Sequence, residues 1–488
     1  MNYPRLLFKN EALPKVMPEN ILSDLKLDVL LPAEVCDFLL RGADKDNILL
    51  RQDMFSRLLS DKSGRAEEEI GALRLLLSDG KRLYRALNRA SCESEEAYIF
   101  PFLMRDITEF SQKAAEISGY GELFDRFSAF FSNVCSGSAF TAAAGRLGEI
   151  TEAITGAASL IIKTDGDSSK ILRESPEDLT SALEGCAREL GINLSGKVMR
   201  PFALQKSVAE AAAKLSPEVF GRASEFYLEY RTLISGEIFE YLEELEFIAG
   251  MLDFTRRAQK SGIPYSFPSV TEEKKLDFKN IYDVTLLIKN EEHIVPNDAF
   301  FCSDEPFFYL TGANGGGKTT FLRAIGVAVV FFLAGAPVFC EKGEACVFES
   351  VLTHFPRDER FEGSGRFFDE IRRVQEILDF PAVRSGKSLI LLNETYATTG
   401  EDKALEYTAE LALKLYKSGN FGLYITHQHE LSENIIPFLG VVIDETDSNR
   451  RTYRIEKRRL PPKSFARDIL EKYGLTREAL EKRFGLDK

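Results

Sequence analysis

The 488-residue sequence has no tryptophan, only four histidines and no apolar run long enough to span a membrane. Its longest uncharged stretch, Ala324 to Cys340, contains Pro337 and falls short of the roughly 20 residues that cross a bilayer. The N-terminus reaches charged residues quickly and lacks the apolar core of a signal peptide. We therefore expect a soluble, cytoplasmic protein without a membrane partner.

The seven cysteines are scattered, and no two of them form a C-x-x-C pair. The histidines form no H-E-x-x-H, so neither a zinc site nor a disulfide framework is indicated. The formal net charge of −14 argues against indiscriminate coating of nucleic acid, which needs a cationic surface, but it leaves room for a local basic patch. With 44% hydrophobic and 28% charged residues, the chain has a globular composition, and its length favours about three domains.

The first half of the chain has mostly helical periodicity, which predicts a helical core or lever domain over residues 1–275. Ser216-Pro217-Glu218 has the residue types that start a helix. The pattern from there to residue 260 is either one rod of about 65 Å or shorter helices broken near Gly221, Gly236 and Gly250. The polar stretch between Lys163 and Lys197 predicts either the tip of a clamp-like arm near 160–200 or a surface loop.

After residue 276, short β-rich runs alternate with helical stretches, which predicts βαβ units and a mainly parallel sheet. The predicted strands are Val284–Ile288, Phe307–Leu310, Ser388–Leu392, Phe421–Thr426 and Val441–Asp444. Two short helical stretches, Ser464–Tyr473 and Thr476–Phe484, follow Pro461-Pro462. We expect an ATPase domain over 276–460 and a helical tail over 461–488.

A phosphate-binding loop of the form G-x-x-x-x-G-K-[ST] follows the apolar strand at Phe307. Its glycines let successive N–H groups turn toward phosphate oxygens, and the helix that follows adds its positive end. Lys318 is expected to reach the β- and γ-phosphates of a nucleoside triphosphate, and the Thr319 hydroxyl to ligate Mg²⁺. The predicted nucleotide-binding residues are Gly312, Ala313, Asn314, Gly315, Gly316, Gly317, Lys318, Thr319 and Thr320.

Two further strand ends carry polar residues. The buried strand 388–392 ends in Asn393-Glu394, where a Walker B element carries Asp and then Glu. Glu394 is the predicted residue that polarises water. Asn393 has no charge, but it can still hydrogen-bond a metal-bound water. His427, at the end of the strand that starts near Phe421, is a candidate sensor of the γ-phosphate, although a lone histidine is often structural.

Over roughly residues 276–475 these motifs resemble the MutS family of mismatch-repair ATPases, which are related to ABC-type ATPases. The family's T-G-P-N-M-G-G-K-S-T is matched by the segment from Thr311 to Thr320, and its F-I-P-N-D block by the segment from Ile294 to Asp298. The resemblance implies ATP and Mg²⁺ as ligands. It also places Ile294 where the family has an aromatic residue that stacks on adenine, so that Ile294 or His293 would cover the base.

The family's signature loop, ending in S-T-F-x-x-E, is similar to the segment from Gly363 to Glu370, with the serine offset by one position. In the family this loop reaches the γ-phosphate bound by the other subunit. The resemblance therefore implies a homodimer in which Ser364, Gly365 and Arg366 complete the site in trans. Arg366 is equally well explained as a solvated surface residue. Lys463-Ser464-Phe465 resembles the start of the family's C-terminal dimerisation helices.

The family's mismatch-reading domain has a Phe-x-Glu wedge, whereas Phe-x-Glu occurs here only inside the ATPase half, as in Phe368-Asp369-Glu370. We expect no specific mismatch reading and no appended nuclease domain. DNA contact follows mainly from the resemblance. Two groups of basic residues add modest support, although the first also fits an exposed charged strand. They are Arg451, Arg454, Lys457, Arg458, Arg459 and Lys463, and near the arm Lys197, Arg200, Lys206 and Lys214.

The predicted fold is thus an α/β P-loop (ABC-type) ATPase domain preceded by a mostly α-helical domain. The predicted function is a MutS-like ATPase that acts as a nucleotide-driven dimeric clamp on duplex or branched DNA in repair or recombination. Because Asn393 lacks a charge, an ATP-binding switch with little hydrolysis is a second hypothesis, and a protein partner in place of DNA is a third. A small-molecule P-loop kinase leaves the signature loop and His427 unexplained.

Overall fold

The computed structural model describes residues 3–9, 11, 13–158, 160–165, 168–173, 206–289, 294–356, 366–396, 401–428, 431, 435–443, 451–457 and 483. The chain divides into two compact units. Met1–Glu11 and Ser60–Ala249 form the first, here called the helical unit. Ala12–Leu59 and Gly250–Lys488 form the second, here called the sheet unit. None of the described helices has the length and apolar character needed to cross a bilayer.

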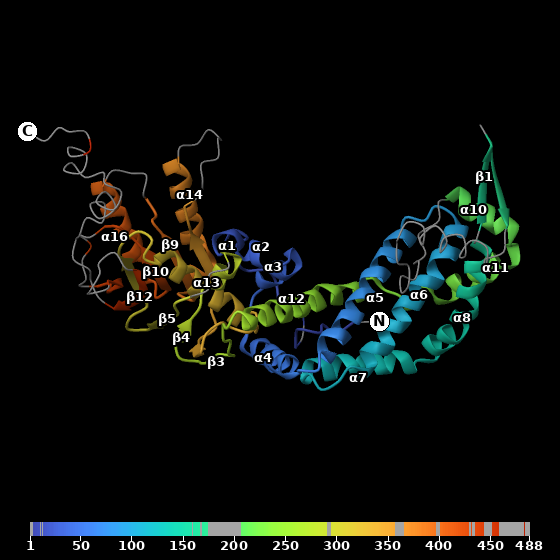
Figure 1. The fold of residues 1–488 in the computed structure, drawn as a ribbon, viewed down its shortest axis with the longest axis horizontal. Helices are drawn as coiled ribbons and strands as arrows, with labels where there is room; N and C mark the ends of the chain where they lie inside the picture. The colour runs from blue at the N-terminus through green and yellow to red at the C-terminus, as the bar shows by residue number, and fades with distance from the viewer. Residues whose placement is uncertain are drawn as a thin grey trace, which may run out of the picture. The chain divides into compact units, whose positions relative to one another are not determined.

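The helical unit is built mainly from packed α-helices (Figure 1). They are α5 (Arg65–Leu87), α6 (Glu93–Glu116), α7 (Glu122–Ser136), α8 (Ser138–Ala158), α10 (Lys206–Leu215) and α11 (Pro217–Tyr230), with the 3₁₀ turns η1 (Arg231–Leu233) and η2 (Gly236–Phe239) and the start of α12 (Glu240–Lys260). Their core is rich in phenylalanine. Phe127, for example, packs against Phe131 and Tyr241 with ring centroids 4.9 and 5.1 Å apart. Edge-to-face contacts of this kind hold the helices together.

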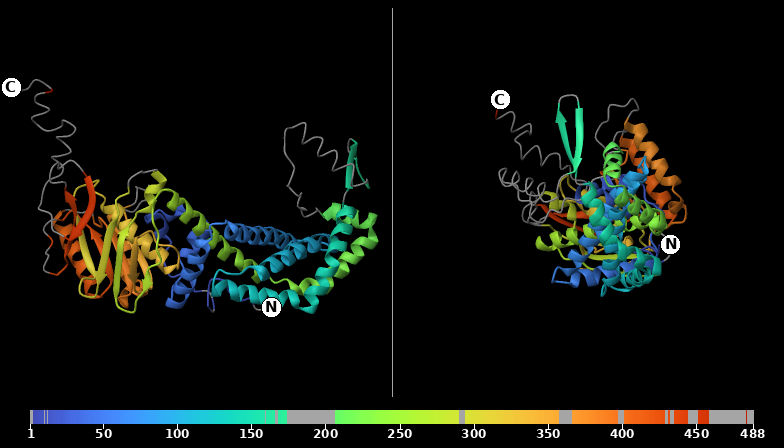
Figure 2. Two further views of the ribbon diagram at one scale, coloured as in Figure 1. Left: turned by 60° about the horizontal axis from the view of Figure 1, so that its bottom comes forward. Right: turned by 90° about the vertical axis from the view of Figure 1, so that its right-hand side faces the viewer.

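A two-stranded antiparallel hairpin, β1 (Leu160–Asp165) and β2 (Ser168–Arg173), follows α8 (Figure 2). It occupies the first part of the polar segment for which the sequence left an arm tip and a surface loop open. Residues 174–205, which include Lys197 and Arg200, lie outside the described part of the chain.

The prediction of one long helix over 216–260 is wrong. The alternative, shorter helices with breaks near glycines, is confirmed at Gly236. Pro217 opens α11 as predicted, but the helix ends at Tyr230, and α12 begins only at Glu240. Ser235 is extended, and its side chain accepts a hydrogen bond from Glu237 N, which starts a new helical turn. A Cβ at Gly236 would lie 3.2 Å from the Tyr84 hydroxyl oxygen, so the chain passes close to α5 at this break.

The sheet unit contains two sheets. The six-stranded sheet has the order β12-β11-β6-β10-β9-β8, and only its edge strand β12 is antiparallel to its neighbour. Its strands are β6 (Phe307–Thr311), β8 (Ser350–His354), β9 (Ser388–Asn393), β10 (Phe421–Ile425), β11 (Phe438–Ile443) and β12 (Arg451–Lys457). The four-stranded sheet, β3-β7-β4-β5, contains β3 (Ser269–Val270), β4 (Lys275–Ile281), β5 (Asn297–Cys302) and β7 (Lys342–Ala345). The mainly parallel sheet predicted for this part of the chain is confirmed.

Helices cover both faces of the six-stranded sheet, which explains why β6, β9 and β10 are buried throughout. The helices of this unit are α1 (Asn20–Asp24), α2 (Leu27–Leu30), α3 (Ala33–Leu39), α4 (Lys45–Ser60), α13 (Lys318–Leu333), α14 (Arg366–Asp379), α15 (Pro381–Arg384) and α16 (Glu401–Lys417). Ile390 and Leu392 pack with α14 and α16. Leu391 faces the other way, toward α13, where a Cβ on Gly326 would lie 2.9 Å from its side chain.

The division into units differs from the boundary expected at residue 275, because residues 12–59 group with the C-terminal half. Asn20 Nδ2 donates to Thr353 O at 3.2 Å, and a Cβ on Gly326 would lie only 2.6 Å from Leu25. These contacts join residues more than 300 positions apart, which local periodicity does not reveal.

One predicted strand is also wrong. Val284–Lys289 forms the 3₁₀ helix η3 rather than a strand, because Asp283 Oδ1 accepts a hydrogen bond from Thr285 N at 2.9 Å and starts a helical turn. The predicted tail helices, 464–473 and most of 476–484, lie outside the described residues.

Candidate nucleotide-binding site

The predicted phosphate loop lies between β6 and α13, the strand–loop–helix context that the motif requires. Two glycines are needed for its shape. Gly317 has φ of 93°, a left-handed conformation that side chains disfavour. Gly316 has no space for a side chain, since a Cβ would lie 2.9 Å from Ala313 O and 3.1 Å from Val441. The backbone therefore makes a tight turn just before the first turn of α13.

Lys318 folds back into this loop. Its Nζ donates to Gly312 O at 2.7 Å and to Ala313 O at 3.1 Å, and the residue is only 5% exposed. Burial lowers the pKa of the ammonium group, and the negative charge of Glu394 opposes this change. The loop therefore holds a largely desolvated positive charge, which favours an anionic ligand.

The parallel pairing of β6, β10 and β9 brings their carboxyl ends to the same edge of the sheet. Tyr424 pairs with Tyr309, and Ile425 pairs with Asn393. Backbone hydrogen bonds continue past the strands, from Thr426 N to Leu310 O at 3.1 Å and from Glu394 N to Ile425 O at 3.0 Å. Residues from three separate sequence motifs thus converge at the phosphate loop.

Glu394 and His427, the predicted catalytic residues that follow β9 and β10, are in direct contact. Glu394 Oε1 lies 2.9 Å from His427 Nε2. This hydrogen bond is the main cause of a lowered pKa for Glu394, and the positive charge of Lys318 adds to it. Because this pKa is lowered, the Glu394 carboxylate is ionised at neutral pH. The backbone of Glu394 has φ of 51°, an uncommon conformation for a residue with a side chain.

Asn393 and Thr311 are buried beside this pair and have unsatisfied polar atoms. Among the described residues, neither Asn393 Oδ1 nor Thr311 Oγ1 has a hydrogen-bond partner. Such groups are costly to bury without a partner, so they suit a site that a polar ligand completes. With the hydroxyl of Thr319 in the first turn of α13, they form a set of oxygen atoms of the kind that Mg²⁺ prefers. The residues present therefore fit the expected ion.

A cavity of about 150 Å³ adjoins the loop. Its walls include Gly317, Thr320 and Phe321 on the α13 side, with Val295 and Tyr453 from other segments. Of the two residues expected to cover a base, Ile294 is half-buried and is not among the cavity's lining residues, whereas His293 lies outside the described residues.

Tyr453 was missed by the sequence interpretation, which treated its strand only as a basic stretch. Tyr453 is 46% exposed. Its ring lies against Gly317, because a Cβ atom added to Gly317 would be 3.4 Å from Tyr453 Cδ1. Asn297 anchors its backbone by donating from Nδ2 to Tyr453 O at 3.0 Å and accepting from Ile455 N at 2.8 Å. The residue pattern of the strand that contains Tyr453 does not indicate that this ring contacts the phosphate loop.

Asp283 is a second residue that the sequence interpretation missed. It lines the same cavity and is 3% exposed. Burial raises the pKa of its carboxyl group, and among the described residues its Oδ2 atom has no hydrogen-bond partner. The cavity beside the loop therefore combines an aromatic ring with a buried carboxyl group, although the two residues are 170 positions apart.

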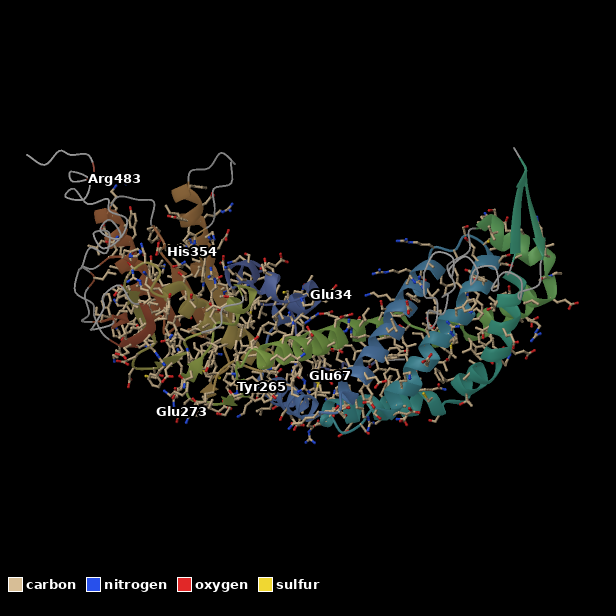
Figure 3. All side chains as sticks on the ribbon, in the orientation of Figure 1. Glu34, Glu67, Tyr265, Glu273, His354 and Arg483 are labelled. Atoms are coloured by element: carbon tan, nitrogen blue, oxygen red, sulfur yellow. The ribbon has the colours of Figure 1, made fainter. Side chains whose placement is uncertain are left out.

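The helix that follows the predicted signature loop is fixed to the end of β8. Arg373 of α14 donates to Phe355 O at 2.7 Å and to Asp24 Oδ2 at 3.3 Å. His354, labelled in Figure 3, ends β8, and its Nδ1 lies 3.2 Å from Thr395 Oγ1. Ser364 and Gly365 lie outside the described residues, and Arg366 is the first residue of α14.

Comparisons with known proteins agree with this geometry. Residues 308–459 match the family model of MutS domain V. The chain is 28% identical over 276 residues to the DNA mismatch repair protein MutS of Carboxydothermus hydrogenoformans, a match that covers 53% of this chain and 32% of that protein. It is 28% identical over 248 residues to Endonuclease MutS2 of Geobacillus kaustophilus, covering 50% of this chain and 30% of the relative.

A DNA mismatch repair protein MutS from Lactobacillus delbrueckii is 24% identical over 199 residues, which cover 40% of this chain and 23% of that protein. The matches thus span about a third or less of each relative. Together with the family model, they assign the strand, loop and helix described above to MutS domain V. Residues 308–459 of this chain are thus assigned to the MutS domain V family.

Proposed function

We propose that this chain is a DNA-binding ATPase that works as a nucleotide-driven dimeric clamp and does not itself read mismatches. The observation that carries the proposal is the convergence of the Lys318 loop, the buried Asn393 and the Glu394–His427 pair at one edge of the sheet. The proposal includes DNA because two relatives of the chain are a DNA mismatch repair protein and an endonuclease.

In this proposal each residue has a defined task. The loop amides and Lys318 bind the phosphate groups of ATP, while Thr319 and Asn393 hold Mg²⁺. When bound, the ion supplies positive charge that offsets the charge of the phosphates. Glu394, kept ionised by its contact with His427, orients a water molecule and accepts its proton. His427 reports the occupied site through that same hydrogen bond.

Two further parts of the site belong to the proposal. Tyr453 packs against the nucleotide base in the cavity beside Gly317, taking the place that the resemblance gave to Ile294 or His293. Ser364, Gly365 and Arg366 complete the site from the second subunit of a homodimer. The firm attachment of α14 through Arg373 supports this role, because a residue that acts across an interface needs a fixed base.

The Glu394→Gln variant tests the enzymatic part. We expect steady-state ATP hydrolysis to fall by about 10²- to 10⁴-fold, the usual contribution of a positioned acid–base group, while ATP binding by calorimetry stays within a fewfold of the parent. Glu410→Gln, an exposed glutamate on α16, is the matched control and should hydrolyse ATP like the parent. Undiminished turnover in Glu394→Gln would remove Glu394 from the mechanism.

A second candidate function is an ATP-binding switch with little hydrolysis, acting on a protein partner. Asn393 favours it, because a neutral amide holds a divalent cation less strongly than a carboxylate does. The Asn393→Asp variant separates the two. If the parent binds ATP at micromolar concentration without turnover and Asn393→Asp gains hydrolysis, the switch is the better description. Sedimentation with and without Mg-ATP tests the dimer in either case.

A further inference from the structure

The last two turns of α5 and the residues just beyond them are strongly basic. Between Gly80 and Cys92 the chain carries four basic residues and no acidic residue, although the whole protein has a net charge of −14. The basic residues are Lys81, Arg82, Arg85 and Arg89. This local excess of positive charge lies in the helical unit, where no sequence motif pointed to a function.

The spacing of three of these residues places them on the same face of the helix. Lys81, Arg85 and Arg89 follow one another at intervals of four residues, so they rise in steps of about 6 Å along one side. Arg89 lies just past the C-cap Asn88, in a turn in which Arg89 N donates to Ala86 O at 3.1 Å. Glu67, labelled in Figure 3, marks the opposite end of α5.

The opposite face of α5 fixes the stripe in position. Leu76 and Leu83 are buried on that side. A Cβ on Gly80 would lie 3.4 Å from both Ile107 of α6 and Phe239 of η2, so the helix backbone packs closely against its neighbours. The basic side chains therefore project from a rigid base.

Lys81, Arg85 and Arg89 form no ion pair within the described part of the chain. Arg85 and Arg89 are exposed and Lys81 is partly exposed, and no carboxylate of the described residues lies within 4 Å of them. Other arginines of the same helix are engaged. Arg74 pairs with Glu246 of α12 at 2.9 Å, and Arg82 lies 3.9 Å from Asp79.

We propose that Lys81, Arg85 and Arg89 form a basic stripe that contacts the phosphate backbone of DNA. The proposal rests on the DNA-binding function proposed above and assigns to it a place on the chain. A regular row of long cations that have no carboxylate partner among the described residues suits a polyanion whose charges also repeat at regular intervals.

An acidic protein is a poorer fit for the same surface. Protein interfaces rely on aromatic or aliphatic anchors at their centre. The large apolar side chain recorded as exposed on α5 is Leu75, which lies six positions before Lys81 and thus outside the stripe. The stripe offers charge without such an anchor, which favours the nucleic acid.

The experiment measures how binding of the full chain to a fluorescent 30-base-pair duplex depends on salt, by anisotropy. Each lost phosphate contact lowers the slope of log K against log salt by about 0.9. We expect Lys81→Gln/Arg85→Gln/Arg89→Gln to reduce the slope by about 2.7, and Arg89→Gln alone by about 0.9. The melting temperature and ATP binding should stay unchanged, because the altered side chains are on the surface.

The matched control Lys62→Gln/Lys113→Gln/Lys417→Gln removes the same charge from three other exposed positions. If it lowers the slope as much as the stripe variant, general charge explains the effect and the stripe is refuted. If the parent binds duplex with a clear salt slope that the stripe variant retains, the stripe is also refuted, but the proposed function stands. If the parent binds no duplex at low salt, both fail. Equally tight binding of polyglutamate overturns the assignment to DNA.

Discussion

Two buried polar side chains, Glu244 in the helical unit and Asn393 in the sheet unit, differ in whether their oxygen atoms have partners. In the helical unit, Glu244 is completely buried, but both of its carboxylate oxygens have partners: Arg5 Nε at 3.0 Å and Leu6 N at 2.9 Å. In the sheet unit, Asn393 Oδ1 is buried beside the phosphate loop, and the described residues give it no partner. A buried polar group that is already satisfied holds a structure together, whereas one that is not satisfied is ready for a ligand.

The same contrast holds for aromatic residues. Phe127 in the helical unit is 2% exposed and touches other rings on several sides. Tyr453 in the sheet unit is 46% exposed and lies beside Gly317. The backbone of Tyr453 has φ of 56°. The first arrangement optimises packing, while the second keeps a ring available at some cost in backbone conformation. Stability and ligand binding should therefore respond to different substitutions.

The largest effect is expected for Phe127→Ala. Removing a fully buried ring should lower the free energy of unfolding by about 3–5 kcal/mol. Because the chain lacks tryptophan, urea unfolding is best followed by circular dichroism. ATP affinity of the folded variant should equal that of the parent, because Phe127 belongs to the other unit.

Leu228→Ala is the control in the same unit. Leu228 is 63% exposed, so its truncation should change the unfolding free energy by less than about 0.5 kcal/mol. A loss of ATP binding in folded Phe127→Ala would contradict the claim that the helical unit does not affect ATP binding.

Tyr453→Ala is the counterpart in the sheet unit, with a smaller expected effect. Stacking of a base on an aromatic ring contributes about 1–3 kcal/mol, so we expect ATP to bind about tenfold more weakly, with little change in stability. Tyr453→Phe keeps the ring and should bind ATP like the parent. Calorimetric titration with ATP and with inorganic triphosphate distinguishes base from phosphate contacts. Equal losses for both ligands would contradict a role in base binding.

The parts of the site that the sequence predicted are those specified by neighbouring residues. A glycine-rich loop between an apolar strand and a helix, and polar residues directly after buried strands, are visible within short windows. Parallel pairing then brings these ends together, so the contact between Glu394 and His427 follows from correct strand assignments. The location of Lys318 was predictable for the same reason.

The parts that the sequence did not predict depend on contacts between distant segments. Tyr453 and Asp283 meet at one cavity only through the tertiary fold. The break before α12 involves Gly236 and Tyr84, which are about 150 positions apart. At η3, the β-branched residues Val284 and Thr285 suggested a strand, but the hydrogen bond from Thr285 N to Asp283 prevailed over that local preference.

The smallest expected effect concerns pH, and it sharpens the comparison between the two units. Burial lowers the pKa of Lys318, so this ammonium loses its proton at a lower pH than an ordinary lysine. Bound triphosphate favours the protonated form. ATP affinity should therefore fall as pH rises through the lowered pKa, and proton uptake should accompany binding on the alkaline side.

Calorimetry in buffers of different ionisation enthalpy, from about pH 7 to 9.5, measures that uptake. Lys318→Arg is the matched variant, because a guanidinium stays charged over this range and should flatten the dependence. Glu244 supplies the contrast: burial raises its pKa, so its contribution to stability is present at acid pH and is lost as pH rises through the raised pKa. If Lys318→Arg retains the alkaline loss of affinity, the titrating group is not Lys318, and the buried charge in the loop is not what the triphosphate meets.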